Sequence, residues 1–473
     1  MEKNKLSSEK ISKLLLSLAI PSIIAQLVNV LYNMVDRIYI GQMPDGTTAM
    51  ASLSVALPIL TLVTAFTRLV GEGGAPLCAI RMGEQKQDKA EEIMTASFVS
   101  LIGMGFLLTV IILIFKESLL ILFGANEETL PQAISYISIY ALGTIFVQLT
   151  LGMNPYINTQ GFAKIGMCTV VIGAVLNIIL DPIFIFGLHM GVSGAALATI
   201  IAQGVSAFWV LSFLFGKKST IKIRKKYLIP QPRIVFSIMA LGISPFVMSS
   251  TESLLQISFN NQLSLYGGTM AVATMAILMS LWQFITLPLQ GLCKGAQPIL
   301  SYNYGAKNYT RVRQTFQLVF KLCIGFACLI GALIMVFSQF FVSIFASDPQ
   351  TIAFASWAVK IYLFGSGIFG AQICCQQSFM ALGQAKISLT MAILRKIVLL
   401  IPLIYIFPYL LGRTSFALMM SSSIVNMVKS SGCVFAVLFA EPVSDILAAF
   451  ITTTMFIRFY RKELKKPDSY VES

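Results

Sequence analysis

The stretch GEGGAPLCAIRMG (residues 71–83) has a counterpart 222 positions later, within GLCKGAQPILSYNYG (291–305). The offset pairs Gly73 with Gly295, Pro76 with Pro298, and Gly83 with Gly305. It also carries GFAK (161–164) onto GQAK (383–386). Agreement of several motifs at one spacing indicates that the chain contains two related halves.

Both stretches lie in a very apolar chain. Charged residues make up 11% of the 473 residues and hydrophobic residues 56%, whereas about 25% of a soluble protein is charged. Mean hydropathy is +0.81, and apolar runs long enough to cross a bilayer recur throughout. We therefore predict an all-α polytopic membrane protein. The twelve expected spans are 14–40, 51–80, 92–115, 131–158, 163–187, 192–215, 234–264, 271–298, 314–345, 351–380, 387–411 and 435–459.

One hydrophilic break divides the spans. The basic connector KKSTIKIRKKYLIPQPR (217–233) separates an N-terminal lobe (1–216) from a C-terminal lobe (234–473). Six spans in each lobe make equivalent spans run in the same direction, a parallel repeat of the kind found in transporters. Near the end the offset grows from 222 to 242, which predicts an external insertion near 413–433.

The net charge of +14 could indicate nucleic-acid binding, but its distribution argues against that partner. On the twelve-span model, 26 of the 34 Lys and Arg residues fall on the side of the termini and connector and three on the opposite side. Because such an excess marks cytoplasmic loops, we expect both termini to be cytoplasmic and the protein to lie in a lipid bilayer. No cleavable signal precedes the first span.

The first span carries a polar stripe. Its residues Gln26, Asn29, Asn33 and Asp36 are spaced by 3, 4 and 3, so they share one helix face and are expected to line an internal cavity. Pro21, one turn before the stripe, removes a backbone hydrogen bond and is a candidate hinge.

A second polar group comes from the fifth and sixth spans. Asn177 and Asp181 share one helix face, as do Thr199 and Gln203. Together with Asp36, the residues Asn177, Asp181 and Thr199 offer oxygen ligands for a small cation such as sodium, and two carboxylates near each other also hold protons. A polar cluster that only orients helices is the alternative.

The repeat makes this group asymmetric. The offset of 222 places Leu399 and Leu403 opposite Asn177 and Asp181, and an offset of 224 places Asn260 opposite Asp36. Ion coupling is therefore predicted in the N-terminal half alone.

The seventh span adds Glu252, Gln256 and Asn260 on one face. We assign these three, with Asn33 and Gln203, to a substrate cleft. Glu252 could instead be the structural partner of a basic group.

Two further pairs of charged residues receive structural interpretations. Arg68 and Glu72 are four residues apart and predict an internal salt bridge. Glu441 and Asp445 are interpreted as acids at the start of the last helix.

Several functions are excluded by missing motifs. The chain has no GxxxxGK[ST] or HExxH sequence, so neither ATP hydrolysis nor zinc-dependent hydrolysis is expected. We predict that it is not an enzyme and needs no cofactor beyond a coupling ion, sodium or proton. The eight cysteines are interpreted as core thiols.

The chain resembles the multidrug and toxic compound extrusion (MATE) family, in its MepA-like bacterial branch. The matching strings are LYNMVDRIYIGQ, GEGGAPLCAIRMG, LNIILDPIFIFG, GVSGAALAT, SPFVMSSTESLLQ, LPLQGLCKGAQPILSYNYGAKNY and FAEPVSDILAAF. The resemblance implies twelve helices in two pseudo-symmetric six-helix lobes around a central cleft, and export of organic cations in antiport with sodium ions or protons.

The resemblance also implies site residues. Asp36, Asn177, Asp181 and Thr199 match the family's cation site, and Glu252 resembles its acid of the seventh helix. The acid that some members carry on the tenth helix is absent, since Ala371 and Gln372 occupy that region. We expect a bacterial plasma-membrane protein that is monomeric and has no obligate protein partner.

Three alternatives stay open from the sequence. A lipid-linked oligosaccharide flippase would need Arg or Lys in the cleft to bind its anionic cargo, whereas the predicted cleft acids Asp36, Asp181 and Glu252 favour cations. An integral membrane enzyme and an ion channel are the alternatives from other classes, and no motif supports either.

Overall fold

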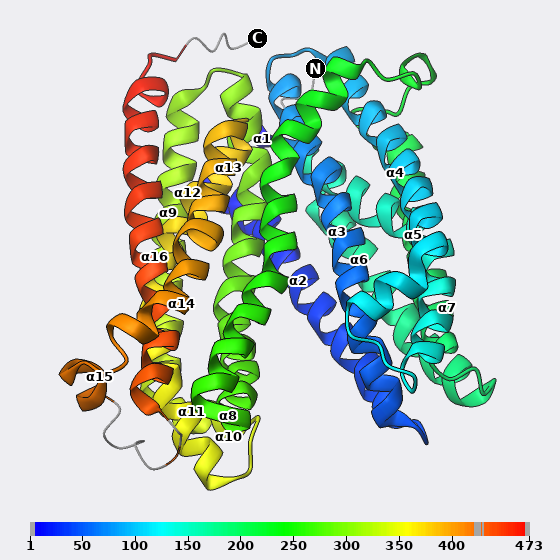
Figure 1. The fold of residues 1–473 in the computed structure, drawn as a ribbon. Coiled ribbons are helices and arrows are strands. Elements are labelled where there is room, and N and C mark those ends of the chain that lie inside the picture. Colours follow the sequence, from blue (N-terminus) through cyan, green and yellow to red (C-terminus); the bar gives the residue numbers. More distant parts are fainter. Residues whose placement is uncertain (1–4, 421–426, 428–429, 469–473) are drawn as a thin grey trace.

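A computed structural model describes residues 5–420, 427 and 430–468 of the chain. In this part all regular secondary structure is helical, and there is no β-strand (Figure 1). The prediction of an all-α fold is confirmed.

The N-terminal half contains the elements α1 (Lys5–Ser8), α2 (Ile11–Gly41), α3 (Gly46–Gly83), α4 (Gln87–Leu122), α5 (Leu130–Thr159), α6 (Ala163–Pro182), the π-helical turn η1 (Ile183–Gly187) and α7 (Val192–Phe215). The connector carries one 3₁₀ turn, η2 (Lys225–Tyr227).

The C-terminal half contains α8 (Pro232–Gly305), α9 (Tyr309–Val336), α10 (Ser338–Ser343), α11 (Pro349–Tyr362), α12 (Ser366–Ala381), α13 (Ala385–Ile393), the π-helical segment η3 (Leu394–Leu400), α14 (Ile401–Leu410), α15 (Ser415–Met420), α16 (Ser431–Phe459) and the π-helical turn η5 (Tyr460–Leu464).

These helices account for twelve spans. Ten helices in the described ranges are long and apolar enough to cross a membrane, and α11 with α12 forms an eleventh span bent by 50°. One of the ten, α8, has 74 residues, whereas a span needs about 20. Its backbone breaks at Gly268 (φ 66°, ψ −159°), a conformation that favours glycine. Dividing α8 there gives the twelfth span.

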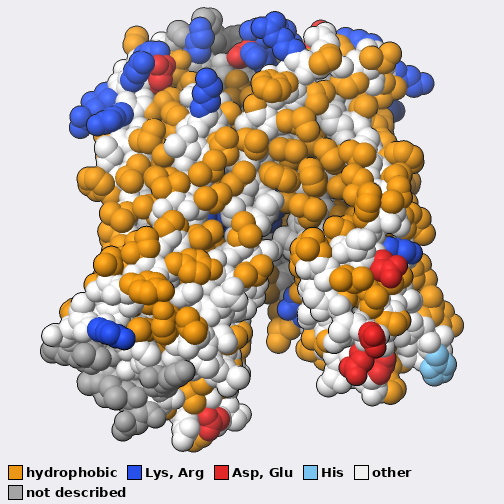
Figure 2. All heavy atoms as spheres, in the orientation of Figure 1, with side chains coloured by type: hydrophobic (Ala, Val, Ile, Leu, Met, Phe, Trp, Pro, Cys, Tyr) orange, Lys and Arg blue, Asp and Glu red, His pale blue; other side chains and the backbone are white. Residues whose placement is uncertain are grey.

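The two halves stand side by side in Figure 1, with α2–α7 on one side and α8–α16 on the other. They meet at the end where the chain begins and finishes, and they diverge toward the opposite end. At the joined end, Asn303 Nδ2 donates to the Leu6 carbonyl oxygen over 3.0 Å, and Asp468 Oδ1 accepts from Thr310 N over 3.0 Å. The space-filling view shows a hollow between the halves at the other end (Figure 2).

The repeated motif holds the halves together. A Cβ atom at Gly83 would lie 1.9 Å from the Tyr302 carbonyl oxygen, and one at Gly305 would lie 2.0 Å from the Ile80 carbonyl oxygen. Since Ile80 and Tyr302 are also 222 positions apart, the two contacts are equivalent under the repeat. Only glycine allows α3 and α8 to approach so closely.

The basic connector 217–233 is fixed to the N-terminal half. Arg224 Nε donates to Glu91 Oε2 over 2.8 Å, and Gln160 Oε1, just beyond α5, accepts from Thr220 N over 2.7 Å. Figure 2 shows Lys and Arg side chains gathered at this end of the molecule.

The last helix differs from the prediction. α16 begins at Ser431, so Glu441 and Asp445 lie well inside the helix and their interpretation as helix-start acids is wrong. Of the predicted insertion at 413–433, α15 lies at the end away from the termini (Figure 1). Residues 421–426 and 428–429 lie outside the described residues, and the external position of the insertion stays a prediction.

Candidate functional site

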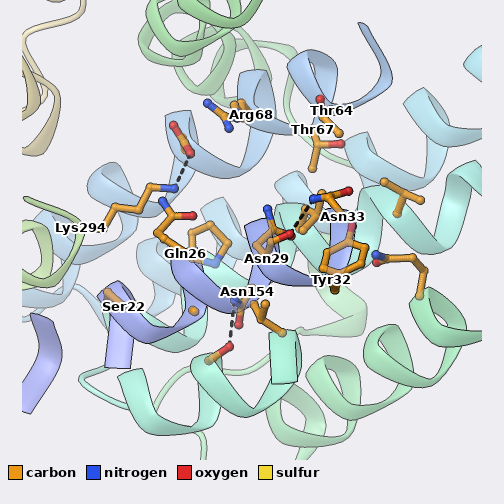
Figure 3. A pocket seen from close by; sticks show the side chains of 18 of the residues that line it. Ser22, Gln26, Asn29, Tyr32, Asn33, Thr64, Thr67, Arg68, Asn154 and Lys294 are labelled. Atoms are coloured by element: carbon orange, nitrogen blue, oxygen red, sulfur yellow. Dashed lines mark hydrogen bonds and ion pairs between the residues drawn. The ribbon is translucent and has the colours of Figure 1, made fainter. Parts of the chain in front are cut away.

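A cavity of about 440 Å³ lies between the two halves. It is lined by side chains from α2, α3, α5, α6, α7, α8 and α12, and Figure 3 shows many of its polar groups converging. The polar lining includes Ser22, Gln26, Asn29, Tyr32, Asn33, Asp36, Arg37, Thr61, Thr64, Thr67, Arg68, Glu72, Tyr136, Tyr140, Asn154, Asn158, Thr159, Thr199, Gln203, Lys294, Gln297 and Gln377.

The polar stripe of α2 faces this cavity. Gln26, Asn29, Asn33 and Asp36 all line it, as their shared helix face requires. Asn33 Nδ2 donates to the Asn29 carbonyl oxygen over 2.6 Å, and Asp36 Oδ1 accepts no hydrogen bond from the described residues.

The predicted cation site is assembled beside the stripe. Asn177 Nδ2 donates to Asp181 Oδ1 over 3.0 Å and lies 3.5 Å from Thr199 Oγ1. Asn177 and Asp181 are buried, with 2% and 0% of their surface exposed. A small second cavity of about 30 Å³ reaches Asn177, and Thr199 lines both cavities. The Asp36 and Asp181 carboxylates are near enough to interact electrostatically.

Several oxygen atoms of this group have no partner. Asp36 Oδ1, Asn177 Oδ1, Asp181 Oδ2 and Gln203 Oε1 are buried and accept no hydrogen bond from the described residues. Buried polar atoms normally have partners, and all four are acceptors only. The donor set therefore fits a small hard cation, or protons on the carboxylates.

Two of the predicted cleft residues line the cavity, Asn33 and Gln203. Glu252, Gln256 and Asn260 are not part of its lining as far as the structure describes it. Glu252 forms an ion pair with Lys396, which also donates to the Met248 carbonyl oxygen over 2.8 Å. This arrangement matches the alternative interpretation of Glu252 as the partner of a basic group.

The floor of the cavity carries an ion pair between the halves. Lys294 Nζ lies 3.3 Å from Glu72 Oε1, and the two residues are 222 positions apart. The predicted Arg68–Glu72 salt bridge is wrong, because Glu72 turns to the other half. Within the described part of the chain, Arg68 has no ion-pair partner.

The repeat and the matching strings can be compared with known proteins. The family model MatE matches this chain twice, over residues 21–183 and again over 245–406. The chain belongs to the MatE family. Since the two matches begin 224 positions apart, they also confirm the repeat.

Relatives with the name multidrug export protein MepA include proteins from two staphylococcal species. The protein from Staphylococcus haemolyticus is 28% identical over 445 residues and covers 94% of each chain. That from Staphylococcus aureus is 27% identical over 404 residues, which cover 85% of this chain and 88% of its own. A solved structure described as the outward-facing conformation of a multidrug resistance MATE family transporter shares the fold, with a TM-score of 0.87, 22% identity and 99% coverage of both chains.

Membership of the MatE family confirms that the chain is not an enzyme. It also confirms the predicted multi-pass membrane fold. Within that fold, α2 runs unbroken through Pro21 from Ile11 to Gly41, and a bend at this proline stays a prediction.

The sequence analysis did not predict how the buried charges of the C-terminal half are paired. Arg395 Nε donates to Asp445 Oδ1 over 2.8 Å, and Arg395 Nη2 donates to Glu441 Oε1 over 2.9 Å. All three residues are buried. Two adjacent basic residues inside an apolar span were the available signal, because such residues are costly unless they are paired.

Proposed function

We propose that this MatE-family protein exports organic cations in exchange for sodium ions or protons, by alternating access. The observation that carries the proposal is a cavity whose wall presents buried carboxylate and amide oxygens without partners. The names of the two staphylococcal relatives support export of drugs.

The side of the membrane to which the cavity opens follows from the proposed orientation of the protein. The halves are joined at the basic end and diverge at the other (Figure 2). Since basic loops favour the cytoplasm, we place both termini and the connector 217–233 inside, in a bacterial plasma membrane. The cavity then faces outward. Ser469, for which the sequence makes the same prediction, lies outside the described residues.

The lining suits a drug-sized cation. A volume of about 440 Å³ lies within the range of small-molecule sites, roughly 300–1,000 Å³. Tyr32, Tyr136 and Tyr140 stand on the same wall as Asp36, and aromatic faces attract organic cations. A lipid-linked oligosaccharide would be far larger than this space.

Exchange follows from competition for the same negative charge. A sodium ion held between Asp36 and Asp181, or a proton on one of them, cancels one negative charge of the pair. The organic cation is then held less strongly, α2 bends near Pro21, and the organic cation leaves outward. Each elementary charge that moves down a potential of 100 mV supplies about 2.3 kcal/mol, roughly a fifty-fold gradient in a one-for-one exchange.

The proposal is tested in proteoliposomes that contain a fluorescent organic cation. A sodium gradient and a pH gradient are imposed separately on the wild-type protein and on Asp36→Asn, and dye movement is followed. One of the gradients should drive the wild-type protein, and neither should drive the variant. No movement of dye by the wild-type protein under either gradient would refute the proposal.

Orientation is tested separately. Lys218→Cys should react with a membrane-impermeant maleimide only after the membrane is opened, with the wild-type protein as the baseline for the native cysteines. Labelling of intact cells at this position would reverse the orientation.

A further inference from the structure

The charge of the cavity is more mixed than the sequence predicted. Alongside the acids Asp36 and Glu72, its lining includes Arg37, Arg68 and Lys294. Glu72 and Lys294 form an ion pair with each other, and the neighbours Asp36 and Arg37 attract each other, so Arg68 is considered separately.

The carboxylates closest to Arg68 already have other partners. Glu72 and Glu252 are both within electrostatic range of its guanidinium. Glu72 forms its ion pair with Lys294, and Glu252 forms its ion pair with Lys396. Each acid is thus paired with one lysine, and Arg68 forms no ion pair of its own among the described residues.

Arg68 is also open to the cavity. It is exposed on α3 and lines the cavity together with Thr64 and Thr67 of the same helix (Figure 3). Arginine offers five hydrogen-bond donors and no acceptor, and its planar group pairs with a carboxylate through two parallel bonds. The chemistry that this position recognises is a carboxylate.

Another part of the cavity lining has the reverse need. Asn154 Oδ1, Asn158 Oδ1 and Gln203 Oε1 are buried acceptors without partners, and so is Asp36 Oδ1. These atoms come from α2, α5 and α7, and all four residues line the same cavity. These four oxygens therefore lack hydrogen-bond donors, and Arg68 lacks an ion-pair partner within the described part of the chain.

We propose that Arg68 is an anion-binding subsite that takes the carboxylate of a zwitterionic organic substrate, whose cationic group lies toward Asp36 and the amide oxygens. The inference rests on the proposed export function and names a substrate class for it. A purely cationic substrate leaves Arg68 unpaired, whereas a zwitterion offers a carboxylate to Arg68 and a cationic group to the unpartnered oxygens.

A matched pair of dyes tests the subsite. Rhodamine 123 is the methyl ester of rhodamine 110, so the two differ in whether the carboxylate is free. Export of each is measured in proteoliposomes with the wild-type protein, Arg68→Gln and Arg68→Lys. Lys89→Gln, which removes one exposed positive charge outside the cavity, is the control.

Arg68→Gln should raise the KM for rhodamine 110 about tenfold, the effect of losing a charged hydrogen bond. Its KM for rhodamine 123 should change less than about twofold, which also shows that the variant is folded. Arg68→Lys should retain part of the affinity for rhodamine 110, because lysine keeps the charge but loses the paired geometry. Lys89→Gln should alter neither dye.

The outcomes separate the two proposals. If the wild-type protein moves rhodamine 123 but not rhodamine 110, or if Arg68→Gln weakens both dyes equally, the subsite is refuted and the export function stands. If the wild-type protein moves neither dye, the export function itself fails.

Discussion

The two halves share one scaffold but treat their buried acids in opposite ways. In the N-terminal half, Asp36 and Asp181 have no ion-pair partner among the described residues, and each keeps a buried oxygen without a hydrogen bond. In the C-terminal half, Arg395 bonds to both Glu441 and Asp445, so both acids have a basic partner, although Asp445 Oδ2 also accepts no hydrogen bond from the described residues. An acid that already has a basic partner attracts an external cation less strongly, so this difference supports the proposed ion coupling in the N-terminal half.

The first prediction tests the difference between the halves at Asp181, where the largest effect is expected. Asp181→Asn should abolish gradient-driven export of a cationic dye, because asparagine nearly keeps the shape but removes the charge. Leu403→Ala, at the position equivalent to Asp181, should retain most of the export. Dye efflux from proteoliposomes at matched protein levels measures both, and an Asp181→Asn protein that still concentrates dye would overturn the assignment.

The second prediction concerns the paired acids. Arg395→Met should lower the free energy of unfolding by about 3–5 kcal/mol, because two buried carboxylates lose their partner. Arg413→Met, at an exposed arginine, should stay within about 0.5 kcal/mol of the wild type. Unfolding by SDS in mixed micelles gives both values, and equal losses would show that the Arg395 cluster is not a structural centre.

Much of the fold and of the N-terminal polar site could be predicted from the sequence. The apolar runs gave the spans, and the 3, 4, 3 spacing placed the α2 stripe on one face because helix geometry is local. The pairing of Arg395 with Glu441 was not readable, since 46 residues separate them and only packing brings them together.

Two sequence interpretations failed for related reasons. Glu441 was assigned to a helix start because the insertion before it obscured where α16 begins. The Arg68–Glu72 pair was predicted from spacing alone, whereas in the folded chain Lys294 of the other half reaches Glu72. Spacing within one helix cannot predict a partner such as Lys294, which is 222 residues away in the sequence and reaches Glu72 only in the folded chain.

The third prediction concerns the contribution of Glu252 to stability. Its side chain is 59% exposed, whereas that of Lys396 is 7% exposed. Glu252→Gln should therefore cost about 1–3 kcal/mol of unfolding free energy, because it leaves a buried ammonium group without its carboxylate. Lys396→Gln should cost less, because water can solvate Glu252.

The double variant decides between structure and substrate binding. Glu252→Gln with Lys396→Gln should be about as stable as Lys396→Gln alone and should still export cationic dyes. If stability returns but export of cationic dyes is lost while export of neutral drugs continues, Glu252 itself holds the cation, as the sequence first suggested.

The smallest expected effect on stability concerns Glu72 and Lys294, where the halves meet as repeat equivalents. This pair is partly exposed, with 19% and 37% of the side chains accessible, so breaking it should cost less than about 1 kcal/mol. Its effect on transport should be larger.

Glu72→Lys places two lysines opposite each other beside Arg68 and should slow export, whereas Lys294→Glu leaves Arg68 near both acids and should slow it less. Because the repeat relates the two positions, the double exchange gives each side chain the other's surroundings and should restore most of the rate. Glu127→Lys, a charge reversal at an exposed loop residue, controls for net charge. If the double exchange exports no faster than Glu72→Lys, attraction between these two residues does not close the floor of the cavity.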